Sequence, residues 1–393
     1  MLFWTDPYHK LGAELTNAKQ TTAKGTPEDT ANAKQTTAKS VLGTAAKSVP
    51  EVIGIKRYGI EELQDLVTSY GQPAYRAEQL IEWLYCRWVS EYSEMSNLPK
   101  ALRDALSSEH PLTKPEVVER QVSTDGTRKY LLKLADETFV ETVGIPENQR
   151  LTVCFSTQVG CGMGCSFCAT GHLGLIRQLS PGEMVDQLLV VAADFDLRVS
   201  NAVAMGEGEP FANYTATMAA LRLMNHSKGL NIGARHLTVS TSGIIPGIKS
   251  LAKEPEQFRL AVSLHSARQV TRDVLMPGLA VYRLPALRQS LLDYCQDSGR
   301  RVTLEYTLIE GINDSEAEIK ALIKFTEGIN CHINLICLNP TEQVDLEVFK
   351  PPSSRQAQTI CVQLQAAGIE TTLRRSRGVD INSACGQLAG SSL

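Results

Sequence analysis

Short runs of apolar residues recur along the chain from residue 150 onward. They cover 151–155, 201–205, 236–240, 258–264, 302–308 and 333–338. Runs of this length, bounded by polar or glycine-containing segments, are typical of strands that are buried on both faces of a parallel sheet. Segments with helical periodicity lie between most of them. The pattern predicts an α/β fold, an open and partial (β/α)6 barrel.

Signals of a helix start follow two of these runs. Ser180 and Glu183 have the spacing of a capping box, and Pro181 occupies the first helical position. We expect this helix to extend to about residue 195. Ser315, followed by two glutamates within three residues, predicts a second helix start.

Polar motifs follow five of the six predicted strands. They are the cysteine-rich stretch 160–168 and the segments 205–210, 240–243, 263–265 and 339–340. The chemistry of barrels of this kind lies at the carboxyl ends of the strands. We therefore expect the five motifs to meet at one rim.

The chain before residue 150 has a different pattern. Residues 1–50 contain the polar octamer Asn-Ala-Lys-Gln-Thr-Thr-Ala-Lys twice, which predicts a disordered low-complexity tail. Apolar residues at helical spacing predict a helical accessory domain over 55–112. Alternating segments around an Asp-Gly turn predict a β-rich subdomain over 113–150. The barrel and a C-terminal loop then take 151–393; the family resemblance described below implies that this loop belongs to the active site.

Composition narrows the setting in which the protein works. With 393 residues and 43% hydrophobic content, the chain can bury one large core and a small domain. It contains no run of eighteen apolar residues, so we expect no membrane span. The ten cysteines suggest a reducing compartment, and we expect a cytoplasmic protein. Residues 1–50 lack the features of a secretory signal, and their lack of arginine makes organellar import the weaker alternative.

The net charge of −4 gives no general sign of a nucleic-acid partner. Phosphate binding needs only a local basic face. Arg374, Arg375 and Arg377 are candidates near the C-terminus, and Lys129 is one nearer the front. Taken alone, these residues are more typical of a solvated surface.

Three cysteines define the strongest motif. Cys161, Cys165 and Cys168 have C-x3-C-x2-C spacing and stand among glycines. Three thiolates on one tight loop can bind three irons of a [4Fe-4S] cluster and leave the fourth iron open for a small molecule. Structural zinc is the alternative, but it usually takes a second cysteine pair, and here His172 is the only near candidate for a further ligand.

The motif, with the aromatic Phe167 before its last cysteine, resembles the radical S-adenosylmethionine (SAM) superfamily. The longer pattern resembles the RlmN/Cfr RNA methyltransferases within it. That family has a further cysteine at the position of Cys154 and ends in a run like Asp380-Ile-Asn-Ser-Ala-Cys385-Gly-Gln-Leu-Ala-Gly390. The resemblance extends over about residues 55 to 390.

The resemblance implies two cofactors, the cluster and SAM, with SAM bound to the open iron. It implies that Glu209 contacts the amino group of SAM and that Asn339 pairs with the adenine edge. Ser240 would bind the ribose or the carboxylate. The remaining implied cofactor contacts are Gly208, Ser263, Leu264 and His265.

The resemblance also implies a chemistry and a substrate. Cys385 becomes S-methylated, Cys154 forms a transient disulfide with it, and Glu141 or Cys154 accepts the ring proton. The methyl group goes to C2 of an adenosine in 23S ribosomal RNA, and transfer RNA is a second family substrate. An electron donor such as flavodoxin or ferredoxin is implied, and we expect a monomer. Methylation at C8 of adenosine, as in the antibiotic-resistance branch, stays open as an alternative.

The sequence departs from the family pattern at two places. Glu207 stands where the family usually has methionine, and Pro277-Gly-Leu-Ala where it usually has Pro-Ile-Asn. These departures keep a non-enzymatic RNA-binding or iron–sulfur scaffold protein open as an alternative. A glycyl-radical activating enzyme is a further alternative, and it has no need for the pairing of Cys154 with Cys385.

Overall fold

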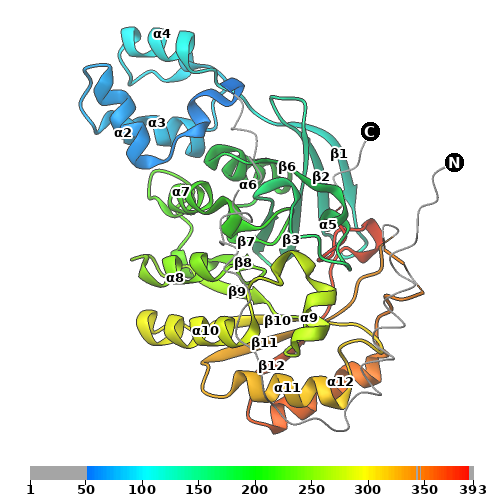
Figure 1. Ribbon diagram of the computed structural model, residues 1–393. Coiled ribbons are helices and arrows are strands. Elements are labelled where there is room, and N and C mark those ends of the chain that lie inside the picture. Colours follow the sequence, from blue (N-terminus) through cyan, green and yellow to red (C-terminus); the bar gives the residue numbers. More distant parts are fainter. Residues whose placement is uncertain (1–50, 342–343, 346, 389–393) are drawn as a thin grey trace, which may run out of the picture. The chain divides into compact units, whose positions relative to one another are not determined.

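A ten-stranded sheet runs through the computed structural model, which describes residues 51–341, 344–345 and 347–388 (Figure 1). The tail predicted over residues 1–50 lies outside the described residues. The strand order is β1-β2-β3-β4-β7-β8-β9-β10-β11-β12. Within the described ranges no strand ladder joins β1 to β12, so the sheet is open, as predicted.

Seven neighbouring strands of this sheet are parallel. They are β4 (Arg150–Phe155), β7 (Val199–Ala204), β8 (Leu237–Thr241), β9 (Arg259–Ser263), β10 (Val302–Leu308), β11 (Cys331–Cys337) and β12 (Thr371–Arg374). The first six confirm the six predicted strands. The seventh, β12, was not predicted, because it is only four residues long and two of its positions are exposed.

Helices connect the parallel strands and cover the sheet. They are α6 (Pro181–Phe195), α7 (Tyr214–Asn225), α8 (Ile245–Lys253), α9 (Gln269–Leu275), α10 (Leu284–Ser298), α11 (Glu316–Thr326) and α12 (Ser354–Ala366). Both predicted helix starts are confirmed: Ser180 and Glu183 form the capping box of α6, and the Ser315 side chain caps α11. Figure 1 shows α6, α7, α8 and α10 following one another along one side of the sheet.

Three antiparallel strands extend the sheet at the β4 edge. They are β1 (Glu116–Val122), β2 (Arg128–Lys133) and β3 (Phe139–Glu147). Gly126 turns the chain between β1 and β2 with φ of 85°, which confirms the predicted Asp-Gly corner. Register places Val143 of β3 opposite Cys154 of β4. Residues on β3 that share the face of Val143 therefore lie on the same side of the sheet as Cys154.

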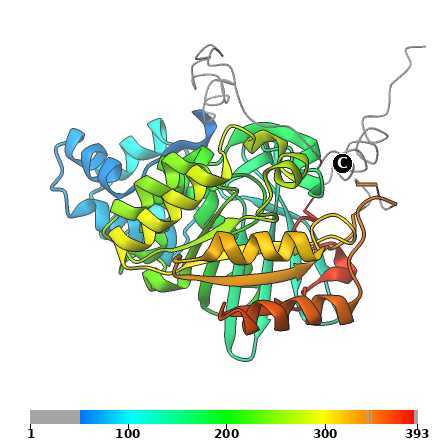
Figure 2. The same ribbon diagram turned by 60° about the horizontal axis from the view of Figure 1, so that its bottom comes forward.

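The N-terminal helical unit packs against the barrel helices. It contains a 3-10 segment (Glu51–Arg57), α2 (Ile60–Ser69), α3 (Arg76–Ile81), a π turn (Glu82–Cys86) and α4 (Lys100–Glu109). Lys56 forms a buried ion pair with Asp186 of α6 at 2.6 Å, and the indole of Trp88 donates to the same carboxylate. Figures 1 and 2 both show this unit beside α6 and α7. The contacts fix the unit to the barrel through buried groups.

A small ribbon and a short helix carry the cysteine motif. The ribbon pairs β5 (Gln158–Cys161) with β6 (Gly174–Gln178), and α5 (Ala169–Leu173) lies between them. No helix among the described residues has both the length and the apolar content needed to cross a membrane.

Candidate active site

The cysteine loop is built on glycines that no other residue could replace without strain. Gly160 has φ of 72°, and a Cβ atom there would lie 2.1 Å from the carbonyl oxygen of Gly174 across the ribbon. The amide of Gly278 donates to the carbonyl of Met163 at 3.2 Å, and a Cβ at residue 278 would lie 2.4 Å from that oxygen. The segment that departs from the family pattern after Pro277 therefore packs directly on the cysteine loop.

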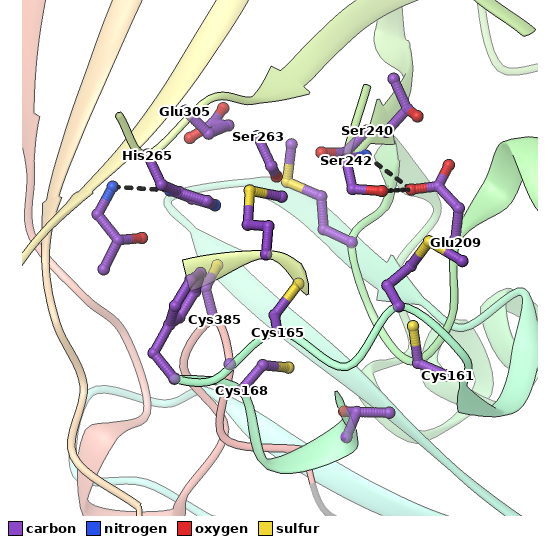
Figure 3. A pocket seen from close by; sticks show the side chains of 18 of the residues that line it. Cys161, Cys165, Cys168, Glu209, Ser240, Ser242, Ser263, His265, Glu305 and Cys385 are labelled. Atoms are coloured by element: carbon purple, nitrogen blue, oxygen red, sulfur yellow. Dashed lines mark hydrogen bonds between the residues drawn. The ribbon is translucent and has the colours of Figure 1, made fainter. Parts of the chain in front are cut away.

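The thiols of Cys161, Cys165 and Cys168 line one cavity of about 160 Å³ at the carboxyl ends of the strands (Figure 3). Within the part of the chain that the structure describes, no three Cys, His, Asp or Glu side chains converge closely enough to share one metal ion. A cubane cluster needs the wider arrangement, because each thiolate binds a different iron. His172 is exposed, and its Nε2 lies 3.3 Å from the carbonyl of Ser166. The donor set fits the [4Fe-4S] cluster that the spacing predicts.

Burial raises the pKa of all three thiols, that of Cys161 to about 12. Metal binding requires the thiolate form, so the positive charge of the irons must replace these protons. A bound cluster would also offset the like-charge repulsion that three neighbouring thiolates would otherwise have in this cavity.

Glu209 accepts three hydrogen bonds inside the cavity. One carboxylate oxygen accepts the N–H of Phe211 at 2.9 Å, and the other accepts the N–H of Ser242 at 2.6 Å together with the Ser242 hydroxyl (Figure 3). Burial raises the pKa of Glu209, and the hydrogen bonds from Ser242 oppose this effect. A carboxylate has about four acceptor positions, so one remains for a ligand cation such as an ammonium group. Neighbouring Gly208 has φ of 99° and also lines the cavity.

His265 faces the cavity as a neutral donor. Its Nδ1 accepts the backbone N–H of Thr307 at 3.0 Å, so the ring proton lies on Nε2. Burial lowers the pKa of His265 to about 3, and the ring of Phe167 packs edge-on at 4.9 Å. Ser240 and Ser263 line the same cavity (Figure 3). Leu264 was also predicted to contact the cofactor, but its side chain is fully buried and lines neither cavity of the site.

A second cavity adjoins the first. Its lining includes Cys154, Asn339 and, at its mouth, the basic segment Arg374-Arg375-Ser376-Arg377. The first cavity also contains Cys385, so this residue stands at the junction of the two. Asn339 donates to the backbone carbonyl of Cys385 at 3.2 Å and lines the second cavity rather than the first.

Residues 375–388, here named the Cys385 loop, are held by the tip of the β1–β2 hairpin. Asp380 accepts the hydroxyl of Ser123 at 2.6 Å and the N–H of Thr124 at 3.1 Å. Asp125 in turn accepts the N–H of Gly378 at 3.1 Å. Further hydrogen bonds tie the loop to α5 and to the end of β11. The loop therefore covers the cavities in a defined position.

Glu141 lies beneath this loop and is almost fully buried. Its carboxylate forms an ion pair with Lys129 at 3.0 Å, and Lys129 also lies 3.4 Å from the carbonyl of Asn382 in the loop. Lys129 is itself nine-tenths buried, so the suggestion that it meets phosphate at the surface is wrong. Glu207 accepts the backbone N–H of Glu141 at 2.8 Å and that of Gly160 at 3.2 Å.

The site residues assigned from the sequence leave out five polar residues of the first cavity: Thr170, Thr241, Ser242, Glu305 and Thr307. Thr241 and Ser242 lie in the segment 240–243, which the rim rule had already selected, although only Ser240 was given a role. Glu305 and Thr307 lie inside β10, where they interrupt an otherwise apolar run. That interruption was the available signal.

Comparisons with known proteins agree with this geometry. Residues 155–323 match the family model "Radical SAM superfamily", and residues 55–111 match "Ribosomal RNA large subunit methyltransferase N-terminal domain". The chain is 43% identical over 352 residues to a "Probable dual-specificity RNA methyltransferase RlmN" of Synechococcus elongatus, covering 88% of this chain and 96% of that protein. A protein with the same name from Alkaliphilus oremlandii is 42% identical, covering 86% and 98%.

A solved structure is similar over the same range. The crystal structure of a radical SAM methyltransferase from Sphaerobacter thermophilus superposes with a TM-score of 0.80 at 43% identity, covering 86% of this chain and all of that one. The cofactors of the chain are accordingly a [4Fe-4S] cluster and SAM. The chain belongs to the RlmN family of radical SAM RNA methyltransferases.

Proposed function

We propose that the protein methylates C2 of an adenosine in 23S ribosomal RNA through an S-methylcysteine at Cys385, with transfer RNA as a second substrate. The observation that carries this proposal is the position of Cys385 between the cavity of the cluster thiols and the cavity of Cys154. A residue that takes a methyl group on one side and delivers it on the other needs access to both.

The chain's own residues divide the work between the cavities. Cys161, Cys165 and Cys168 hold the cluster, and Glu209 binds the amino group of SAM through its remaining acceptor position. Bound together, these cofactors supply a methyl group and a carbon-centred radical that removes a hydrogen atom. This chemistry suits adenine C2, whose C–H bond is not acidic enough for direct polar methylation.

Cys385 carries the methyl group and, after loss of a hydrogen atom, adds its carbon to the ring. The unpaired electron then lies on the RNA adduct, which loses its C2 proton. Cys154 attacks the sulfur of Cys385 as a thiolate, so an S–S bond forms as the S–C bond breaks and the released CH2 carbon takes a proton. One electron passes to a one-electron acceptor, for which the oxidised cluster would serve, and the methylated base leaves. This attack needs a thiolate at Cys154. Burial, together with nearby Cys385, raises the pKa of Cys154 to about 12, whereas Arg374 opposes the increase. Glu141, beneath the loop, is the proposed acceptor of the ring proton.

The second cavity suits a nucleotide of RNA. Arg374, Arg375 and Arg377 are exposed at its mouth. Arginine binds phosphate through paired donors and fixes the position of a nucleic-acid backbone without reading its sequence. The local basic segment explains how a chain of net charge −4 would bind RNA.

The test is product identification with purified, anaerobically reconstituted protein. Ribosomal RNA and transfer RNA fragments are incubated with SAM and a reductant, digested to nucleosides and separated. We expect 2-methyladenosine, and we expect Cys385→Ala to abolish it while Cys86→Ala, at an exposed cysteine of the helical unit, keeps it. Formation of 8-methyladenosine would move the protein to the C8 branch. Absence of both products and of 5′-deoxyadenosine would favour the scaffold alternative.

A further inference from the structure

Glu305 is a buried acid in the first cavity to which the proposed chemistry gives no role. It lies in the middle of β10, is 5% exposed and lines the cavity together with Ser263 and His265 (Figure 3). A buried carboxylate is costly unless its oxygens accept hydrogen bonds. Its presence in the middle of a buried strand therefore calls for a donor.

Only half of the Glu305 carboxylate has such a donor in the described residues. Oε1 accepts the side-chain amide of Asn334 on β11 at 3.0 Å. Oε2 is buried and has no hydrogen-bond partner there. Arg374 and His332 favour the charged form of Glu305 from a distance, yet burial dominates and raises its pKa. The unpartnered oxygen belongs to a side chain that faces the cavity, so a bound ligand is the available donor.

Strand register shows what surrounds this oxygen. Ser263 of β9 and Asn334 of β11 pair directly with Glu305 on either side. The three residues form a polar row across neighbouring strands, about 5 Å apart from one strand to the next. Asn334 already occupies Oε1, so the open side of the row is formed by Oε2 and the Ser263 hydroxyl.

SAM offers three groups of donors: the α-ammonium, the two ribose hydroxyls and the adenine amine. The ammonium matches Glu209, which follows β7 and is three strands away from β10 in the sheet. The adenine ring matches the apolar wall of the cavity at Met276, Ile336 and Leu338. Two adjacent hydroxyls match a carboxylate oxygen beside a serine hydroxyl, because a carboxylate can accept from a vicinal diol.

We propose that Glu305 recognises the ribose of SAM, its Oε2 accepting a hydrogen bond from the 2′- or 3′-hydroxyl beside Ser263. The residue thereby selects ribonucleoside cofactors over their deoxy forms. The inference concerns cofactor binding alone. If it is wrong, the proposed RNA product is not affected. If the RNA product proves to be a different one, the role of Glu305 in cofactor binding still stands.

The test uses reconstituted full-length protein and S-adenosylhomocysteine, with its 2′-deoxy, 3′-deoxy and 6-deamino analogues, titrated by calorimetry. We expect the wild type to bind at least one deoxy analogue about tenfold or more weakly than S-adenosylhomocysteine, as for loss of a hydrogen bond to a charged group. Glu305→Leu should reduce this ratio to within about twofold. Glu310→Leu, an exposed position just beyond the same strand, should keep the wild-type ratio.

Glu305→Gln, which keeps the side-chain volume, provides the same comparison if the leucine variant folds poorly or binds too weakly. Circular dichroism and iron content per chain check the fold of each variant. The proposal is overturned if the Glu305 variants discriminate against the deoxy analogues as strongly as the wild type does. It is also overturned if these variants lose discrimination only against the 6-deamino analogue, which would assign Glu305 to the adenine.

Discussion

Replacing Glu207 by methionine should flatten the dependence of folding stability on pH. The Glu207 carboxyl is 1% exposed, and burial, with the nearby Glu141 carboxylate, raises its pKa from 4.5 to about 8. The native state therefore binds this proton more tightly than the unfolded chain does. The resulting stability is fully present below pH 4.5 and is lost as the pH rises through 8.

The magnitude follows from linkage. One proton that is bound in the native state and released in the unfolded state changes the free energy of unfolding by about 1.4 kcal/mol per pH unit. Between about pH 5.5 and about pH 7.5, the Glu207 proton should account for a loss of about 3 kcal/mol of wild-type stability. Methionine, the residue usual in the family, cannot titrate and removes this contribution.

Urea denaturation of the reduced, metal-free protein at both pH values measures the effect. Other titratable groups are shared by the wild type and Glu207→Met, so the difference between their pH profiles isolates the single carboxyl. Glu78→Met, at an exposed position of α3, should reproduce the wild-type profile. Parallel profiles for the wild type and Glu207→Met would refute the reasoning, because they would mean that Glu207 is ionised throughout.

Three further substitutions test other parts of the structure. Lys56→Ala leaves Asp186 buried without its cation and should destabilise the protein by about 3–5 kcal/mol in urea denaturation. The double variant Lys56→Met, Asp186→Leu should recover most of this loss, because it removes both buried charges. A double variant as unstable as Lys56→Ala would contradict the ion-pair argument. Asp380→Ala removes the acceptor that fixes the Cys385 loop, so it should increase the alkylation rate of Cys385 several-fold without changing that of the exposed Cys86. An unchanged ratio of the two rates would mean that the hydrogen bonds to Asp380 do not hold the loop. Gly160 has a left-handed backbone conformation, and Gly160→Ala would place a Cβ against a carbonyl oxygen. The variant should therefore contain less iron per chain after reconstitution. A normal iron content would contradict this prediction.

The sequence predicted those features that local pattern encodes. Buried parallel strands are apolar on both faces, so β4 and β7 to β11 could be found as runs, and the helix that starts at Ser180 carries its cap in four consecutive residues. The cysteine motif is equally local, because its three thiols lie within eight residues, from Cys161 to Cys168. The rim rule then brought distant motifs such as Glu209 and His265 to one cavity without any further information.

What the sequence left out depends on register and on contacts between distant segments. β12 is stabilised by its neighbour β11 and lacks an apolar run of its own. The role of Glu305 as a cavity residue follows from which face of β10 points inward. The hydrogen bond from Ser123 to Asp380 joins residues 257 positions apart in the chain. Domain boundaries, oligomeric state, electron donor and compartment stay predictions.

The measurement that tests the central claim most directly is the mass of the peptide that contains Cys385. The protein is purified after expression with SAM available, cleaved after Arg377 and analysed by mass spectrometry. The account predicts a gain of one CH2 group on Cys385, and its loss when the methylated protein turns over once on RNA. RNA methylation by protein whose Cys385 never carries this added mass would contradict the account.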